Sequence, residues 1–182
     1  VLQAPQRPTS GVDVQDSCWK MFIYLTWVHP LMSLKKTSST IQIGFSLAET
    51  APNAFIEERV DLQLNPLDNE VFVVLAVKLD PETPDGLAAT NTAVNASVST
   101  TSLTNTGNLS QSQVIATAQR RIDASGFVDG GVGFEQNEGD TPPAMLDYIA
   151  IIATNDFFVQ VKGTGNVNSK GVSGRMYGYR AK

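Results

Sequence analysis

Residues 147–162 read Asp-Tyr-Ile-Ala-Ile-Ile-Ala-Thr-Asn-Asp-Phe-Phe-Val-Gln-Val-Lys, and this stretch decides the class of fold. Its two apolar runs, 148–153 and 157–161, are rich in β-branched and aromatic residues, which favour strands. The tripeptide Thr154-Asn155-Asp156 between them is typical of a turn. The stretch therefore predicts two strands joined as a β-hairpin.

The same alternation of strand and turn recurs along most of the chain. Residues 41–47 place an apolar side chain at every second position, which is the period of a strand with one buried face. Residues 71–77 are seven apolar residues in succession, so we expect a central strand that is covered on both faces. Residues 112–122 fit either a strand or a turn of helix.

These signals add up to roughly eight or nine short strands and no long helix. An all-β chain of this kind closes as a two-sheet antiparallel sandwich, either a jelly roll or an immunoglobulin-like variant. The immunoglobulin version carries a Cys…Trp…Cys marker, and this chain has a single cysteine. We therefore expect an eight-stranded jelly roll.

The sequence divides into two parts. Residues 1–36 form an N-terminal arm plus a first apolar segment, and residues 37–182 form the β-sandwich domain. The arm, residues 1–16, is rich in Pro, Gln and Ser and is expected to be extended. The segment 18–34 favours a strand by residue type, with a short amphipathic helix or a membrane-surface contact as alternatives.

The chain holds little of the chemistry that catalysis requires. Cys18 is the only cysteine and His29 the only histidine, so neither an intrachain disulfide nor a Cys/His zinc site is expected. No Gly-x-Ser-x-Gly elbow or Walker loop accompanies them. We therefore predict a protein that is not an enzyme and binds no cofactor, metal or small-molecule substrate. An apolar run at 21–32 is shorter than the roughly 20 residues that span a bilayer.

Acidic clusters and aromatic side chains are the residues with which a site could be built. The three clusters are Glu57, Glu58 and Asp61; Asp80, Glu82 and Asp85; and Glu135, Glu138 and Asp140. Paired carboxylates act in glycosidases, and the second cluster could supply oxygens to Ca²⁺, but its spacing fits no EF-hand. Aromatic residues that could stack on sugars are Trp19, Trp27, Tyr177 and Tyr179. Solvated strand faces and core packing explain these residues more simply, so no catalytic or metal residue is predicted.

Charge is unevenly distributed in a chain whose net charge is -5. The 34 residues 86–119 carry no charge and are rich in Thr, Ser and Asn. They form either a polar surface hairpin or a protein–protein contact, because a contact without ions has little desolvation cost. Residues 157–182 hold five basic and no acidic residues, which could meet phosphates, acidic lipids or an acidic neighbour.

The arm, the short strands, the uncharged segment and the basic Gly-rich end together resemble the single jelly-roll capsid proteins of icosahedral viruses. The sequence of residues 67–74, Leu-Asp-Asn-Glu-Val-Phe-Val-Val, and that of residues 147–161 are similar to sequences in structural proteins of environmental viruses. The resemblance covers about residues 40–182. It implies a virion protein that assembles with copies of itself and with other virion proteins into a closed shell.

The arm departs from that resemblance. Many small-virus capsid proteins carry an arginine-rich arm that neutralises the genome. Here residues 1–20 hold only Arg7 and Lys20 against Asp13 and Asp16. Genome or inner-membrane contact would then fall to the basic C-terminal end.

Two other classes of function stay open. An extracellular carbohydrate-binding or adhesin-type sandwich would show a shallow aromatic or Ca²⁺ site. A hydrolase would use the cluster of Glu57, Glu58 and Asp61, and this hypothesis ranks last of the three.

Overall fold

The computed structural model describes residues 34–126, 134–139 and 146–182. It divides the chain into two units, Val1–Leu34 and Lys35–Lys182, and the described strands all belong to the second. These strands are β1 (Ile41–Ala48), β2 (Ile56–Asp61), β3 (Val71–Pro81), β4 (Thr92–Ser99), β5 (Val114–Asp123), β6 (Phe134–Gly139), β7 (Ala150–Ile152), β8 (Asp156–Thr164) and β9 (Gly171–Ala181). A 3₁₀ turn, η1 (Pro66–Asp68), precedes β3.

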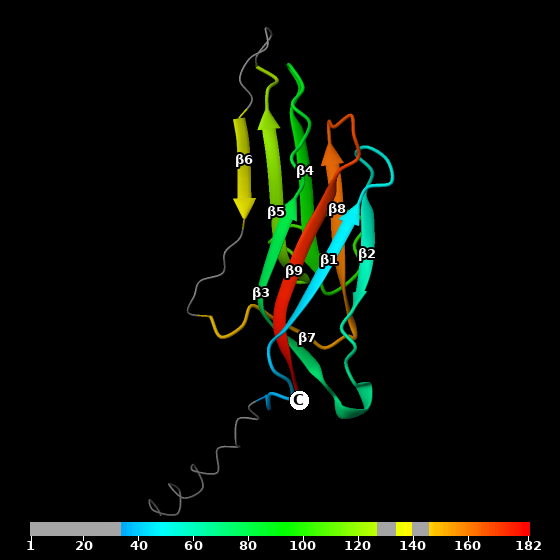
Figure 1. The fold of residues 1–182 in the computed structure, drawn as a ribbon, viewed down its shortest axis with the longest axis vertical. Coiled ribbons are helices and arrows are strands. Elements are labelled where there is room, and N and C mark those ends of the chain that lie inside the picture. The colour runs from blue at the N-terminus through cyan, green and yellow to red at the C-terminus, as the bar shows by residue number, and fades with distance from the viewer. Residues whose placement is uncertain (1–33, 127–133, 140–145) are drawn as a thin grey trace, which may run out of the picture. The chain divides into compact units, whose positions relative to one another are not determined.

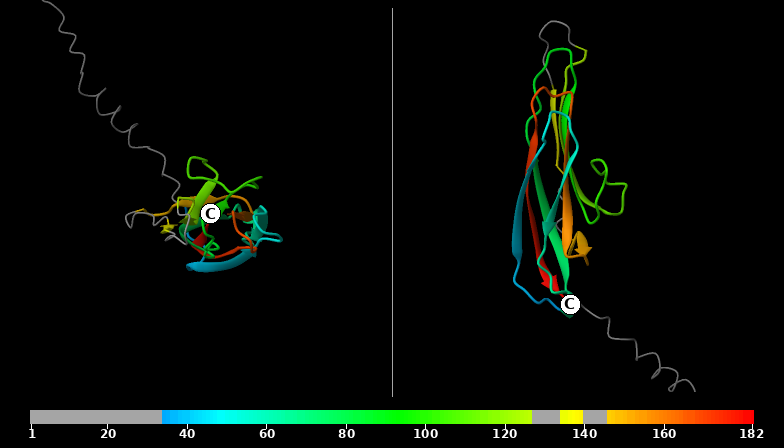
Figure 2. Two further views of the ribbon diagram at one scale, coloured as in Figure 1. Left: turned by 90° about the horizontal axis from the view of Figure 1, so that it is seen from above. Right: turned by 90° about the vertical axis from the view of Figure 1, so that its right-hand side faces the viewer.

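The strands form two antiparallel sheets that pack face to face. Sheet A has the order β1-β9-β3-β7, and sheet B has the order β2-β8-β4-β5-β6. Figure 1 shows the strands, and the edge-on view in Figure 2 (right) places β1 and β9 on one side and β8 on the other. The prediction of an all-β, two-sheet antiparallel sandwich is confirmed. Among the residues that the structure describes, no helix has the length and apolar character needed to cross a bilayer.

The core lies between the inner faces of the two sheets. Sheet A contributes Phe72, Val74, Val77, Ile152, Val172 and Met176, and sheet B contributes Val94, Ala96, Val98, Phe157, Val159 and Val161. Phe45 of β1 meets Phe157 of β8 edge to face, with the ring centroids 5.8 Å apart. Such aromatic pairs add specific contact to the burial of apolar area.

Two sequence predictions about single strands are confirmed. In β1, half-buried and exposed residues alternate along the whole strand, as the period of two requires. In β3, Phe72 and Val73 are both at most 1 % exposed although they point to opposite faces. The strand lies between β9 and β7, so it is central in sheet A, and its first residues are buried on both faces.

The β-hairpin predicted for residues 147–162 is wrong. The first apolar run supplies β7, which pairs with β3 in sheet A, and the second supplies β8, which pairs with β2 and β4 in sheet B. The turn between them crosses from one sheet to the other. Asn155 accepts hydrogen bonds from the backbone N–H groups of Leu62 (2.8 Å) and Leu64 (2.6 Å). The turn thus binds the β2–β3 connection instead of closing a two-stranded ribbon.

The uncharged segment 86–119 is internal only in part. It supplies β4, which lies between β8 and β5 and is buried on both faces, and the first half of β5. The residues between them, 100–113, lie over the outer side of sheet B (Figure 2, right). The predicted surface hairpin is therefore a pair of sheet strands, and the ambiguity at 112–122 resolves in favour of a strand.

Candidate functional site

Three connections at one end of the sandwich are joined by a polar network. They are residues 49–55 between β1 and β2, 82–91 between β3 and β4, and 165–170 between β8 and β9 (Figure 1). Asp85 accepts hydrogen bonds from the backbone N–H groups of Val167 and Asn168, both at 2.9 Å. The ammonium group of Lys170 lies 2.6 Å from the same carboxylate, and both side chains are less than one-fifth exposed. This pair therefore fixes the β8–β9 connection to the β3–β4 connection.

Glu49 and two asparagines complete the network. The carboxylate of Glu49, a residue only 6 % exposed, accepts hydrogen bonds from the backbone N–H groups of Gly163, Lys170 and Asn53. Asn53 and Asn166 bind each other reciprocally through side chain and backbone, at 2.7 and 2.9 Å. The three connections therefore behave as one rigid end, because their buried polar groups are satisfied only together.

The pKa of Asp85 is held well below its usual range. The main cause is the hydrogen bond from Lys170, and the backbone N–H groups of Asn168 and Val167 act in the same direction. Burial opposes the shift but does not outweigh it. The charged form is therefore the form that the fold stabilises.

This shift predicts acid sensitivity. Because the pKa of Asp85 is lower in the folded chain, its contribution to stability is present above the ordinary value of 3.8 and is lost as the pH falls below that value towards the folded pKa. Urea unfolding at about pH 5 and about pH 3 should show a decrease in the wild type and a smaller one in Asp85→Asn. The pKa of the Glu70 carboxyl is also lowered, so the unfolding free energy of the variant should still decrease somewhat between these two pH values. An equal decrease in unfolding free energy in the wild type and in Asp85→Asn would show that Asp85 is not the source of the acid sensitivity.

A second polar network lies on the outer side of sheet B. Gln160 of β8 is fully buried, accepts a hydrogen bond from the hydroxyl of Ser97 (2.8 Å) and donates to Ser99 (2.7 Å) and Glu57 (2.9 Å). Glu57 in turn accepts from the backbone N–H of Leu103 at 2.7 Å. The network therefore holds residues 100–113 against the sheet. A glutamine inside the apolar run 157–161 was the sequence signal for it, and the sequence interpretation missed that signal.

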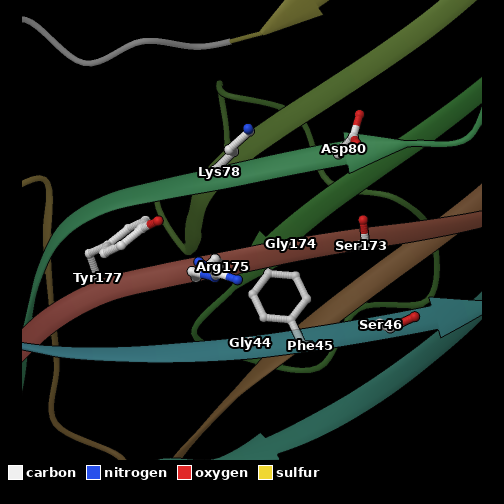
Figure 3. A pocket seen from close by; sticks show the side chains of 9 residues that line it. All are labelled: Gly44, Phe45, Ser46, Lys78, Asp80, Ser173, Gly174, Arg175 and Tyr177. Carbon is white, nitrogen blue, oxygen red and sulfur yellow. The ribbon is translucent and has the colours of Figure 1, made fainter.

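A groove lies on the outer face of sheet A (Figure 3). Its floor includes two cross-strand rows from β1, β9 and β3, with Tyr177 beyond the first of them: Gly44, Arg175 and Lys78; and Ser46, Ser173 and Asp80. The hollow has a volume of about 610 Å³ and lies over Gly44, where a Cβ atom would meet only open space. A second hollow of about 280 Å³ shares Ser46, Asp80 and Ser173 with the first.

The acidic residues that lie close together in the sequence bind different partners in the folded chain. Among the described residues, no three acidic, Cys or His side chains are grouped so that they could hold a metal ion. In the first cluster Glu57 belongs to the Gln160 network, Asp61 pairs with Arg59 at 3.3 Å, and Glu58 is exposed. In the second cluster, three different partners bind the carboxylates: Arg120 binds Asp80 at 2.8 Å, the Gly171 N–H binds Glu82 at 3.0 Å, and Lys170 binds Asp85. The grouped calcium ligands that the sequence allowed are therefore not formed.

Other predicted site residues are dispersed or lie outside the described part. Tyr177 lines the sheet A groove, whereas Tyr179 carries Lys36 over its ring at 4.6 Å. Arg175 lies on the outer face of sheet A and Lys162 on the outer side of sheet B, so the basic residues of the C-terminal end do not form one surface. Cys18, Trp19, Trp27, His29 and Asp140 lie outside the described residues, as does the N-terminal arm, and the side chains of Glu135 and Glu138 are not described.

Comparison with protein-family models, with curated proteins and with solved structures finds no match to this chain.

Proposed function

We propose that the sandwich is a jelly roll and that the chain is a structural subunit of an icosahedral virus capsid, which self-associates into a closed shell. Its partners would be copies of itself and other virion proteins, and its place would be the virion. In this proposal the chain acts as a scaffold and not as a catalyst.

The order in which the strands pair is the observation that carries the proposal. With the edge strand β6 set aside, the first of the eight remaining strands pairs with the last, the second with the seventh, the third with the sixth and the fourth with the fifth: β1–β9, β2–β8, β3–β7 and β4–β5. Such nested pairing results when one long antiparallel ribbon is wound across two sheets. Double-sheet jelly rolls of this kind are used by viral capsid and lectin domains.

The treatment of charged groups also favours a scaffold. Two carboxylates with little exposure, Glu49 and Asp85, are used to lock connections together. Charges that are satisfied in this way stabilise a fixed arrangement of loops, which repeated contacts between identical subunits require. A catalytic carboxylate would instead face a substrate cleft.

Exposed apolar side chains supply surface for such contacts. Leu67 is 91 % exposed in the β2–β3 connection, and Leu109 is 58 % exposed in the segment that lies over the outer side of sheet B. Val167, 64 % exposed, lies in a connection at the opposite end of the sandwich from Leu67. Large apolar side chains presented to solvent are typical of protein–protein contacts, since association removes them from water.

A charge at Leu67 should impair assembly without unfolding the chain. We expect Leu67→Asp to change the unfolding free energy by less than about 0.5 kcal/mol, because the side chain is exposed, and to reduce particle yield strongly. Electron microscopy and light scattering of the full chain give the readout. Thr104→Asp adds the same charge at another exposed position and should assemble normally. A strictly monomeric wild-type chain at all concentrations would contradict the proposed function.

The second candidate is an extracellular carbohydrate-binding or adhesin-type module. The groove on sheet A favours it, because a long shallow hollow with hydroxyl groups, charges and the aromatic rings of Phe45 and Tyr177 suits a saccharide. Assembly does not require the groove, and ligand binding does not require a shell.

A further inference from the structure

We propose that the outer face of sheet A binds an anionic saccharide chain, whose sugars carry carboxylate or sulfate groups, in the groove over Gly44. The proposal rests on the second candidate function and names its ligand. It is independent of assembly into a shell.

Two facing cations define the charge of the groove. Lys78 of β3 and Arg175 of β9 are directly opposite each other in the strand register, and both are exposed. Like charges at such positions repel, which costs stability. Within the described residues neither side chain has a carboxylate within 4.0 Å; Arg175 only donates to the amide oxygen of Gln42 at 3.4 Å. In a chain of net charge -5, such an uncompensated pair favours an anionic ligand.

The carboxylate in the groove does not cancel these charges. Asp80 is bound by Arg120, which reaches it from β5 at 2.8 Å and also lies 3.3 Å from the hydroxyl of Thr83. The pair is formally neutral, so Lys78 and Arg175 supply the net charge of the first hollow. The second hollow also holds the carboxylate of Glu82, which accepts a hydrogen bond from the Gly171 N–H, so the acidic groups of the ligand are placed over the first hollow. The second oxygen of Asp80 can still accept a hydrogen bond from a sugar hydroxyl.

The shape of the groove fits an extended chain. The two adjoining hollows follow the strands past the shared residues Ser46, Asp80 and Ser173, so the groove is longer than it is wide. Gly44 leaves the floor open beside Arg175, because every other residue type would project a side chain there. In Figure 3 the Tyr177 ring lies at the opposite end of the groove from Ser46, where it can stack on a sugar ring.

The same features disfavour a nucleic acid. Binding of single strands depends on successive aromatic platforms and a continuous basic track. The lining of this groove provides one tyrosine ring, two serine hydroxyls and an Asp–Arg pair beside the two cations. Hydroxyls, carboxylate and cations together match a ligand that presents both hydroxyl and acidic groups.

The test is a titration of the full 182-residue chain with four probes: dextran sulfate, oligogalacturonate, unmodified dextran and single-stranded oligothymidylate. At least one of the two acidic saccharides should bind, and unmodified dextran should not. Raising NaCl from about 0.05 M to about 0.5 M should weaken binding about ten-fold, since salt screens exposed charges.

Variants separate the groove from general charge. Lys78→Gln with Arg175→Gln should weaken binding about ten-fold or more, because two charge-assisted contacts are removed. Lys162→Gln with Lys182→Gln lowers the net charge equally at positions outside the groove and should leave the affinity within about two-fold. Gly44→Val fills the floor without changing charge and should also weaken binding about ten-fold, with an unchanged or higher unfolding midpoint because valine suits an open strand position.

The proposal is overturned if Gly44→Val binds like the wild type, or if the two double variants lose affinity equally. It is also overturned if unmodified dextran or oligothymidylate binds as tightly as the acidic saccharides, or if neither acidic saccharide binds. Particles that assemble but bind no saccharide would refute only the groove. A monomer that binds an acidic saccharide would refute only the shell.

Discussion

The Phe157→Ala variant should have an unfolding free energy about 3–5 kcal/mol below that of the wild type. Phe157 is fully buried at the inner face of β8, where its ring contacts the edge of Phe45 across the core. Alanine would remove the ring and leave a cavity between the sheets. Strand β8 is paired on both sides, with β2 and β4, so it can move to close that cavity only in part.

Phe158 provides a matched control for this prediction. It is the next residue of the same strand, points to the outer side of sheet B and is only half-buried. Phe158→Ala should therefore cost clearly less than Phe157→Ala in urea unfolding followed by circular dichroism. Equal losses would mean that the assignment of inner and outer faces of β8 is wrong.

The inward orientation of Phe157 shows how much of this fold can be predicted from the local pattern of apolar and polar residues. Side chains of a strand alternate between its two faces, so the spacing of apolar residues in 41–47 already indicates which side chains are buried. Likewise, an unbroken apolar run such as 71–77 indicates a strand covered on both faces. The class of fold followed from such local signals, and the structure confirms it.

Strand pairing could not be predicted in the same way. Residues 154–156 have the composition of a turn, but composition does not say whether the next strand returns beside the first or joins the opposite sheet. That choice depends on Asn155, whose contacts with Leu62 and Leu64 lie more than 90 residues away in sequence. The hairpin prediction failed because the competing contact is non-local.

The groove could not be predicted from the sequence either, because it also depends on non-local strand pairing. Gly44, Lys78 and Arg175 are neighbours only because β9 lies between β1 and β3. The sequence singled out two residues of the first hollow, Tyr177 as an aromatic that could stack on sugars and Asp80 as a possible Ca²⁺ ligand, but it did not bring them together. The acidic clusters, close in sequence, were poor guides, because neighbouring residues of a strand point to opposite faces and meet different partners.

The Gln160→Ala variant should lose about 3 kcal/mol of unfolding free energy and release residues 100–113 from sheet B. The change removes the acceptor for the fully buried hydroxyl of Ser97, and leaving a buried polar group unsatisfied costs about 1–3 kcal/mol. It also removes the amide donor that links Glu57 and Ser99 and leaves a cavity, which adds to the cost. Thermolysin should then cut more rapidly near Leu103 and Leu109, since local opening exposes the backbone.

Gln42 supplies the matched control, because it is an exposed glutamine on β1. Gln42→Ala should change stability by less than about 0.5 kcal/mol and leave proteolysis unaffected. A Gln160→Ala chain that loses stability without faster cleavage at residues 100–113 would argue that Gln160 stabilises the sheet alone. Faster cleavage together with impaired assembly would instead mean that this segment must be held in place before neighbouring subunits can use it, because a loose segment loses conformational entropy on each contact. The uncharged composition of residues 86–119 would then serve two purposes, with β4 buried inside one chain and residues 100–113 meeting the next.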